Sequence, residues 1–241
     1  MSGHSHWASI KHKKGAADAK RSKLFSKLAR EITIAAREGG GDITFNSKLR
    51  MMVDKAKSLN MPMENIERSI KKGTGEIEGE QLEPIIIEAY GPGGVSLIIE
   101  GITDNKNRTL GEVKKILNER GGKMVAEGAV KWMFDRKGII EIDTSKSDKT
   151  KDDLEMLAIE SGAVDTSWDN ETLEVHTNLE DLEKVRKALE EAGIQAESAS
   201  LGWIAKENIE IGEKDKENCQ KLFEALDEND AVQEIYSNAK E

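Results

Sequence analysis

The sequence predicts an α+β protein in which a small N-terminal helical domain is followed by two ferredoxin-like α/β domains, the second inserted in the first. Two observations predict this fold. Apolar residues recur at helical spacing up to about residue 72, and after residue 81 strand-like and helix-like segments alternate. The later segments follow the order β-α-β-β-α-β, the arrangement of ferredoxin-like domains. With 241 residues, 37% of them hydrophobic, the chain can form several packed cores.

The first helix is predicted over residues 16–38. Leu24, Leu28, Ile32 and Ala35 recur on one side of this helix, and a run of three glycines ends it. The cations of the same segment gather on the opposite side, except Arg21, which falls toward the apolar side. They are Lys20, Lys23, Lys27, Arg30 and Arg37. The helix therefore presents one face to a core and one face of positive charge.

An arm and two shorter helices complete the predicted N-terminal domain, which spans residues 1–75. Residues 1–14 have no apolar period, so we expect an extended arm. Helices are predicted over residues 47–59 and 63–72. Their inward residues are expected to be Leu49, Met52, Val53, Ala56, Met63, Ile66 and Ile70. The Gly/Glu-rich residues 74–81 are typical of a linker.

The remaining segments predict two interleaved α/β domains. The predicted strands are residues 82–89, 95–102, 124–134, 138–143, 163–167, 172–177, 194–200, 203–211 and 232–236. The predicted helices are residues 104–119, 151–161, 179–192 and 214–226. We assign residues 82–135 and 202–241 to one ferredoxin-like domain and residues 136–201 to a second, inserted domain. Three consecutive domains are the alternative, but that division leaves strand edges unpaired.

Charge is distributed unevenly along the chain. The net charge is −10, yet residues 1–72 hold 16 Lys and Arg against 7 Asp and Glu. The remaining residues hold 20 basic against 39 acidic side chains. One end of such a chain suits a polyanion and the other end repels it. We therefore expect the functional site in the N-terminal part.

The arm has the residue types of a nucleic-acid-binding segment. Lysines contact phosphates, and aromatic and histidine rings stack on unpaired bases. On the following helix few acidic residues share the cationic face, which favours phosphate binding over a merely solvated face. The candidate nucleic-acid-binding residues are His4, His6, Trp7, Lys11, His12, Lys13, Lys14, Lys20, Arg21, Lys23, Lys27 and Arg30. A solvated tail is the alternative for the arm.

Other kinds of site have little support. His4 and His6 stand at metal-ligand spacing, but the first 17 residues contain no cysteine or carboxylate, so no metal and no cofactor are expected. The glycine-rich residues 91–94 lack the Gly-Lys-Ser/Thr ending of a P-loop and predict a hairpin turn. Residues 105–109 begin a helix. They could bind an anion at the helix N-terminus or only cap the helix, and the sequence favours neither role. No nucleophile or acid–base pair is evident, so the protein is expected not to be an enzyme.

The sequence also indicates the cellular compartment in which the protein is expected. It contains no apolar run of membrane-spanning length and no secretory signal pattern. The single cysteine, Cys219, excludes an internal disulfide and fits a structural thiol in a reducing compartment. We expect a cytoplasmic protein without a membrane partner.

Several motifs resemble those of the YebC family over essentially the full length. They lie at residues 3–8, 11–14, 18–21, 54–57, 60–62, 65–68, 70–76, 90–94, 103–105, 107–109 and 132–134. The resemblance implies one helical and two α/β domains. Family members carry the label of probable transcriptional regulators, a mitochondrial relative activates translation of a cytochrome oxidase subunit, and relatives assist translation near the peptidyl-transfer centre.

The resemblance and the charged arm together predict a non-enzymatic nucleic-acid-binding regulator of gene expression. The leading interpretation is a ribosome-associated translation factor whose arm contacts rRNA or tRNA. The alternative is a DNA-binding transcriptional regulator, although no helix-turn-helix can be placed from the sequence. The acidic α/β domains could also serve as a protein-docking platform under either interpretation.

Overall fold

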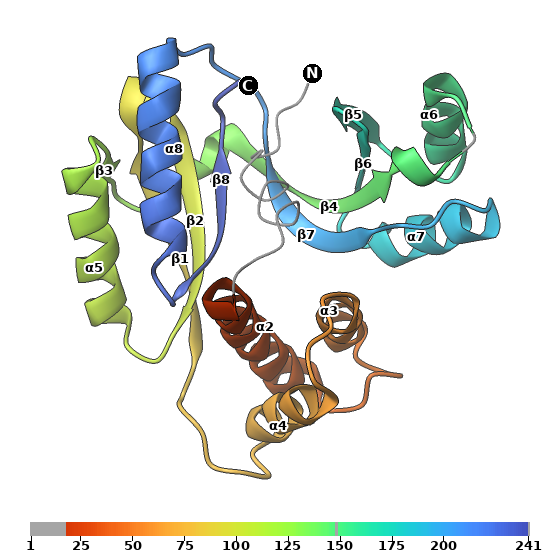
Figure 1. Ribbon diagram of the computed structural model, residues 1–241, viewed down its shortest axis with the longest axis horizontal. Coiled ribbons are helices and arrows are strands. Elements are labelled where there is room, and N and C mark those ends of the chain that lie inside the picture. The colour runs from red at the N-terminus through yellow and green to blue at the C-terminus, as the bar shows by residue number, and fades with distance from the viewer. Residues whose placement is uncertain (1–17, 148, 241) are drawn as a thin grey trace. The chain divides into compact units, whose positions relative to one another are not determined.

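The computed structural model describes residues 18–147 and 149–240 (Figure 1). They form two compact units, which we call the larger and the smaller unit. Among the described residues, the larger unit comprises residues 18–130 and 211–235, and the smaller unit comprises residues 131–210 and 236–240. The α+β class is confirmed, because N-terminal helices precede two antiparallel sheets. The division into three domains stays a prediction.

The N-terminal helices of the larger unit pack around one apolar core. They are α2 (Asp18–Gly39), α3 (Ser47–Ser58) and α4 (Met63–Thr74). Leu28, Ile32 and Ala35 of α2 are buried as predicted. Met63 was predicted to face inward but is 50% exposed, because it begins α4 and Met61, just before the helix, fills the core instead.

A glycine sets the distance between α2 and α4. A Cβ atom at Gly73 would lie 2.4 Å from the carbonyl oxygen of Thr33 and 2.7 Å from Cβ of Ala36. A side chain at this position would therefore separate the two helices. The contact also places the C-terminal end of α4 beside the C-terminal half of α2.

The first sheet has the strand order β3-β1-β2-β8. Its strands are β1 (Glu83–Tyr90), β2 (Ser96–Thr103), β3 (Lys123–Met124) and β8 (Val232–Ser237). The helices α5 (Lys106–Glu119) and α8 (Glu213–Asp227) contact each other beside this sheet (Figure 1). If β2 is counted as the first strand, the order is that of a ferredoxin-like sheet in which β1 occupies the third-strand position.

This sheet corrects two predictions. The strand predicted over residues 124–134 is reduced to β3, and the strand predicted over residues 203–211 is not part of this sheet. The physical reason lies in the buried carboxylate of Glu88. It accepts hydrogen bonds from the backbone nitrogens of Gly128 (2.6 Å) and Val130 (2.7 Å), so this segment binds a side chain instead of a neighbouring strand.

The second sheet belongs to the smaller unit and has the order β5-β6-β4-β7, with all neighbours antiparallel. Its strands are β4 (Phe134–Asp143), β5 (Asp165–Asp169), β6 (Thr172–Thr177) and β7 (Ser198–Ala205). The helices α6 (Lys151–Glu160) and α7 (Leu182–Glu191) contact the strands and each other. This is the predicted β-α-β-β-α-β order, although the last strand starts and ends later than predicted.

Two strands of this sheet are longer than their neighbours. β6 pairs with β4 only over Gly138–Asp143, whereas β7 pairs with β4 from Phe134 to Glu141. Residues 134–137 and 202–205 therefore form a two-stranded extension, which we call the β4–β7 ribbon. A short 3-10 turn, η2 (Lys131–Met133), leads into it, and the carbonyl oxygen of Met133 accepts a hydrogen bond from the nitrogen of Lys206 (2.9 Å).

Within the described residues, every helix is too short or too polar to serve as a membrane span.

Candidate nucleic-acid interface

The arm residues that the sequence singles out lie outside the described residues. They are His4, His6, Trp7, Lys11, His12, Lys13 and Lys14. Lys20 lies in the first turns of α2. Arg21 is exposed, and its guanidinium carbon lies 5.4 Å from the ring centroid of Phe25. The geometry of the interface can therefore be described from Arg21 onward.

Two cations of α2 make internal contacts, which corrects the prediction that they are available to nucleic acid. The ammonium of Lys27 lies 2.7 Å from the Asp227 carboxylate and 3.0 Å from the Asp227 carbonyl oxygen, and its side chain is only 4% exposed. Arg30 donates to the carbonyl oxygens of Ile102 (2.9 Å) and Asp230 (3.1 Å). Lys27 and Arg30 are thus committed to the fold.

Lys23 and Arg37 extend this internal role. Lys23 forms an ion pair of 2.9 Å with Glu228, and Arg37 donates to the carbonyl oxygen of Leu82. The partners of Lys23, Lys27 and Arg30 include the last residues of α8 and the turn after it. A helix C-terminus carries partial negative charge, so cations are stabilised there. The acidic partners of Lys23 and Lys27 are Glu228 and Asp227, about 200 residues further along the chain.

Exposed cations remain elsewhere on the helices. Lys57 of α3 and Arg68, Lys71 and Lys72 of α4 are exposed. The last two stand where α4 meets the C-terminal half of α2, about 27 Å from the start of α2 at 1.5 Å per residue. Lys71 and Lys72 therefore lie far from the first turn of α2. In the sequence these two lysines stand in the run Ile-Lys-Lys-Gly, which indicates the end of a helix but not whether its lysines are exposed.

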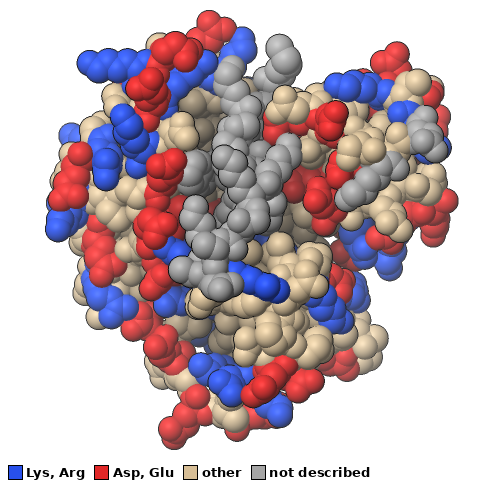
Figure 2. Space-filling model, viewed as in Figure 1, with Lys and Arg blue, Asp and Glu red and all other residues tan. Residues whose placement is uncertain are grey.

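Charge on the described surface is mixed. Figure 2 shows Lys and Arg side chains interspersed with Asp and Glu side chains over the visible described face, with no uniformly basic area. No described helix on this face therefore offers a wide positively charged surface of the kind that binds the phosphate backbone of a duplex.

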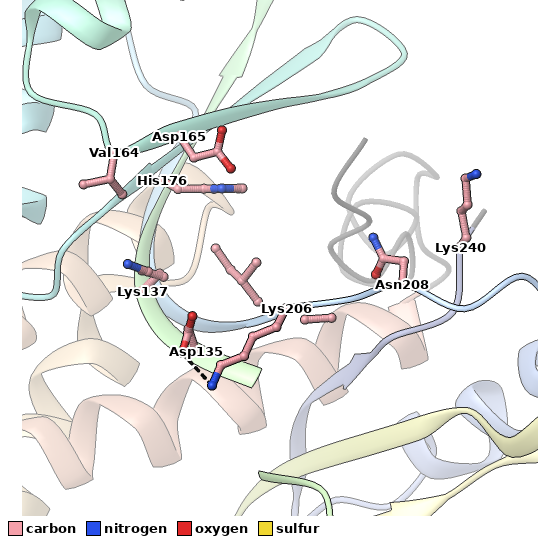
Figure 3. A pocket seen from close by; sticks show the side chains of 10 residues that line it. Asp135, Lys137, Val164, Asp165, His176, Lys206, Asn208 and Lys240 are labelled. Carbon is pink, nitrogen blue, oxygen red and sulfur yellow. Dashed lines mark ion pairs between the residues drawn. The ribbon is translucent and has the colours of Figure 1, made fainter. Parts of the chain in front are cut away.

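The smaller unit contains an open cavity of about 670 Å³ (Figure 3). Its polar lining includes Asp135, Lys137, Asp165, His176, Lys206 and Lys240. The cations partly have acidic partners, since Lys206 pairs with Asp135 at 3.4 Å and Lys240 pairs with Glu210 at 2.7 Å. The cavity thus combines both signs of charge and has no single-sign lining.

His176, which lines this cavity, contacts a serine and a glutamate, but the three do not form a catalytic triad. Ser167 Oγ lies 3.4 Å from Nε2 of His176 and donates to Glu174 over 3.1 Å. Glu174 lies 3.6 Å from the same Nε2 atom. In a triad the carboxylate binds the other ring nitrogen, so that the histidine can accept the serine proton. All three side chains are also buried.

Burial changes the acidity of the glutamate in this cluster. Desolvation raises the pKa of Glu174 above its ordinary value, although hydrogen bonds from His176 and Ser167 oppose the rise. The carboxyl group is therefore more easily protonated than an exposed glutamate. Among the described residues, no group of three His, Cys, Asp or Glu side chains could hold a metal ion.

Two loops that could have bound phosphate have structural roles. Residues 92–94 form a short 3-10 turn between β1 and β2, with Gly93 at φ 69°, so this is the predicted turn. Asn105 caps α5 by accepting a hydrogen bond from the Arg108 nitrogen (3.1 Å), and Arg108 pairs with Asp104. Capping therefore accounts for this helix start.

Fold and site together define a helical and α/β protein whose described residues offer surfaces and small mixed cavities without a catalytic arrangement. Family models match nearly all of the chain: "TACO1/YebC protein N-terminal domain" over residues 5–76 and "TACO1/YebC second and third domain" over residues 82–239. The chain belongs to the TACO1/YebC family.

Full-length relatives and a solved structure agree with this. A "Probable transcriptional regulatory protein" from Halothermothrix orenii is 48% identical, with 99% of this chain and 94% of that protein covered. A protein of the same description from Geobacter sulfurreducens is 50% identical, with 99% and 95% covered. The crystal structure of the conserved hypothetical protein Aq1575 from Aquifex aeolicus matches with a TM-score of 0.90 at 44% identity, covering 98% of this chain and 97% of that one.

Proposed function

We propose that this chain is a non-enzymatic, nucleic-acid-binding regulator of gene expression that acts on the translating ribosome, where its N-terminal arm contacts rRNA or tRNA. The observation that carries the proposal is the position of the positive charge. Residues 1–17 hold three lysines and no acidic residue, and the chain beyond residue 72 is strongly acidic. The names of the relatives support the coarser part, a regulator of gene expression.

The internal contacts of α2 sharpen this proposal. Because Lys23, Lys27 and Arg30 bind acidic and carbonyl groups of the larger unit, they add little to the attraction of a polyanion. The attraction then depends on Lys11, Lys13 and Lys14, together with Lys20 and Arg21 at the start of α2. Trp7 and the three nearby histidines are the stacking groups. Such a contact is small and local, which suits a confined site in folded RNA better than a long duplex.

The experiment is co-sedimentation with ribosomes from a translating extract at low salt. The test variant replaces Lys11, Lys13 and Lys14 by alanine. The control replaces Lys57, Lys71 and Lys72 by alanine, which removes the same charge from exposed positions of α3 and α4. We expect wild type and control in the ribosomal pellet and the arm variant in the supernatant. A wild-type protein that stays in the supernatant contradicts the proposal, and an equal loss in both variants reduces it to general charge attraction.

A DNA-binding transcriptional regulator is the second candidate, favoured by the names of the relatives. The helices α3 and α4 are separated by residues 59–62, a turn length that helix-turn-helix proteins use. However, the exposed N-terminal half of α4 carries Glu64 and Glu67, and this is the part of a recognition helix that enters the major groove. Carboxylates there repel the phosphates on both sides of the groove. A sequence-specific footprint that persists at moderate salt would establish this candidate instead.

A further inference from the structure

The β4–β7 ribbon of the smaller unit joins aromatic rings to positive charge. Trp203 on β7 lies directly opposite Arg136 on β4. The guanidinium carbon of Arg136 lies 5.1 Å from the ring centroid of Trp203, and the ammonium of Lys131 lies 5.4 Å from it. Cations at this distance from an indole ring are attracted to its π-face. The ring and both cations are therefore held together.

A second tryptophan stands beside this group. Trp132 in η2 is 64% exposed, although indole is among the most apolar surfaces a side chain can present. Its segment is fixed to the ribbon, because the Lys206 nitrogen donates to the carbonyl oxygen of Met133. Trp132 is thus presented to solvent from a short, hydrogen-bonded turn.

Charge separates the ribbon from the rest of its unit. Residues 131–137 and 202–206 hold four Lys and Arg against one Asp. The rest of the unit, residues 138–201, 207–210 and 236–240, holds 7 basic against 19 acidic side chains. The ribbon is therefore the part of this unit whose charge balance attracts a polyanion.

The face of the same sheet that carries Ile139 and Glu174 is a poor alternative for RNA. RNA-recognition sheets stack bases on aromatic residues of their central strands. Here Ile139, Glu141, Glu174 and His176 occupy the corresponding positions of β4 and β6, and they are not aromatic except for the buried His176. In this unit a lysine also lies over the ring of Trp168, but at the ribbon two cations lie over one ring and an exposed second tryptophan follows one of them in the chain.

From these observations we infer that the ribbon end, formed by Trp132, Trp203, Lys131 and Arg136, is a second contact site for single-stranded RNA. Trp132 stacks on an unpaired base, and Lys131 and Arg136 contact the neighbouring phosphates. The inference rests on the proposed function and adds a site far in sequence from the arm. A single-stranded partner is required because bases in a duplex are already stacked on each other.

The test measures binding of the full-length protein to a fluorescent oligoadenylate of about 12 nucleotides, a length within the range that single-strand binding sites cover. Trp132→Ala is compared with Trp132→Phe, which keeps a stacking ring. We expect Trp132→Ala to weaken binding at least about fivefold, the lower end of what loss of one stacked base produces, and Trp132→Phe to bind like wild type. The salt dependence should be unchanged in Trp132→Ala and weaker in Lys131→Ala, because only the lysine displaces counterions.

Further outcomes separate this inference from the proposed function. If the arm variant loses the oligonucleotide and Trp132→Ala does not, the ribbon site is wrong and the arm proposal stands. If the wild-type protein does not bind the oligonucleotide, the ribbon site is wrong, and ribosome co-sedimentation alone decides the arm proposal. If Trp132→Ala keeps its RNA affinity but no longer co-sediments with ribosomes, the ribbon contacts a protein, which also overturns the inference. Equal melting temperatures of both variants check the fold, as expected for an exposed side chain.

Discussion

Two groups of lysine and arginine residues in this molecule have different surroundings. On α2, Lys27 and Arg30 bind a carboxylate and carbonyl oxygens of the larger unit, and Lys27 is nearly inaccessible. On the β4–β7 ribbon, Lys131 and Arg136 lie over the ring of Trp203 at a partly exposed position. A row of Lys and Arg residues in a sequence therefore indicates a ligand-binding site only when the contacts of those side chains within the protein are known.

The surroundings explain the difference. At the end of α8 the cations meet oxygen atoms with negative charge or partial charge, and water is largely excluded, so each contact stabilises one arrangement of the helices. On the ribbon the cations lie over the π-face of an indole ring, and a contact of this kind at a partly exposed site stabilises the fold less than a buried ion pair does. Substitutions of Lys27, Arg136 and Lys23 test whether the two groups of cations differ in this way.

The largest effect is expected for Lys27→Ala. The change leaves the Asp227 carboxylate without its nearest cation in a partly buried position, where its side chain is 24% exposed. Removal of one partner from a buried ion pair costs about 3–5 kcal/mol, so we expect about 2–4 kcal/mol for this partly exposed case. Urea denaturation measures the loss. A change below about 1 kcal/mol would show that α2 is held by its apolar face alone.

Each sheet contains a buried glutamate, and the effect of Glu174 on stability is expected to depend on pH. Glu88 receives two backbone donors, whereas Glu174 has side-chain partners and a pKa raised by burial. A raised pKa means that the native state binds the proton more tightly, so Glu174 lowers stability as pH rises from its ordinary value of 4.5 through the raised value. We expect Glu174→Gln to melt about 2–4 °C higher at neutral pH, the shift that ~1 kcal/mol gives a chain of this size.

The same variant has an internal control. Below pH 4.5 the glutamate is protonated in both the native and the unfolded state, so its advantage over wild type should disappear. A stabilisation that is independent of pH would instead point to a packing effect of the amide.

A smaller loss is expected for Arg136→Ala. The guanidinium lies over Trp203 on a ribbon that is partly exposed, and cation–π contacts at such sites contribute about 0.5–1 kcal/mol. Thermal unfolding followed by tryptophan fluorescence measures this contribution. A loss as large as that of Lys27→Ala would mean that the ribbon cations are structural, and the contrast between the two groups would fail.

The smallest effect is expected for Lys23→Ala, the matched partner of Lys27→Ala one turn earlier on α2. Its ion pair with Glu228 is similar in length, but the glutamate side chain is 72% exposed. Exposed ion pairs contribute about 0–1 kcal/mol, and this contribution falls with salt. Denaturation at low and high salt should show a small, salt-sensitive change for Lys23 and a large, less sensitive one for Lys27.

Much of the fold could be predicted because its signals are local. The spacing of Leu28, Ile32 and Ala35 was sufficient to place α2 and its buried face, and turn residues bounded the strands of the second sheet. The first sheet was harder, because its apolar segments do not show which strand pairs with which. No local pattern indicates that Glu88 captures the backbone around Gly128, or that β1 takes the third-strand position.

The candidate site shows the same limit. The small number of acidic residues on the cationic face of α2 seemed to favour phosphate binding, yet the partners of Lys27 and Arg30 stand at Asp227 and Asp230. Contacts over such separations leave no periodic trace in the sequence. The ribbon was missed for a related reason, since Lys131, Arg136 and Trp203 come together only when β4 pairs with β7.

The strand order of the first sheet also bears on synthesis of the protein. β1 and β2 leave the ribosome early, but β8, which borders β2, spans residues 232–237 near the end of the chain. The four strands of the second sheet are all made in between, so that sheet can close while the first still exposes an edge. A nascent chain of this protein thus exposes one edge of β2 until residues 232–237 have been made, and a stop codon before residue 232 removes the strand that covers this edge.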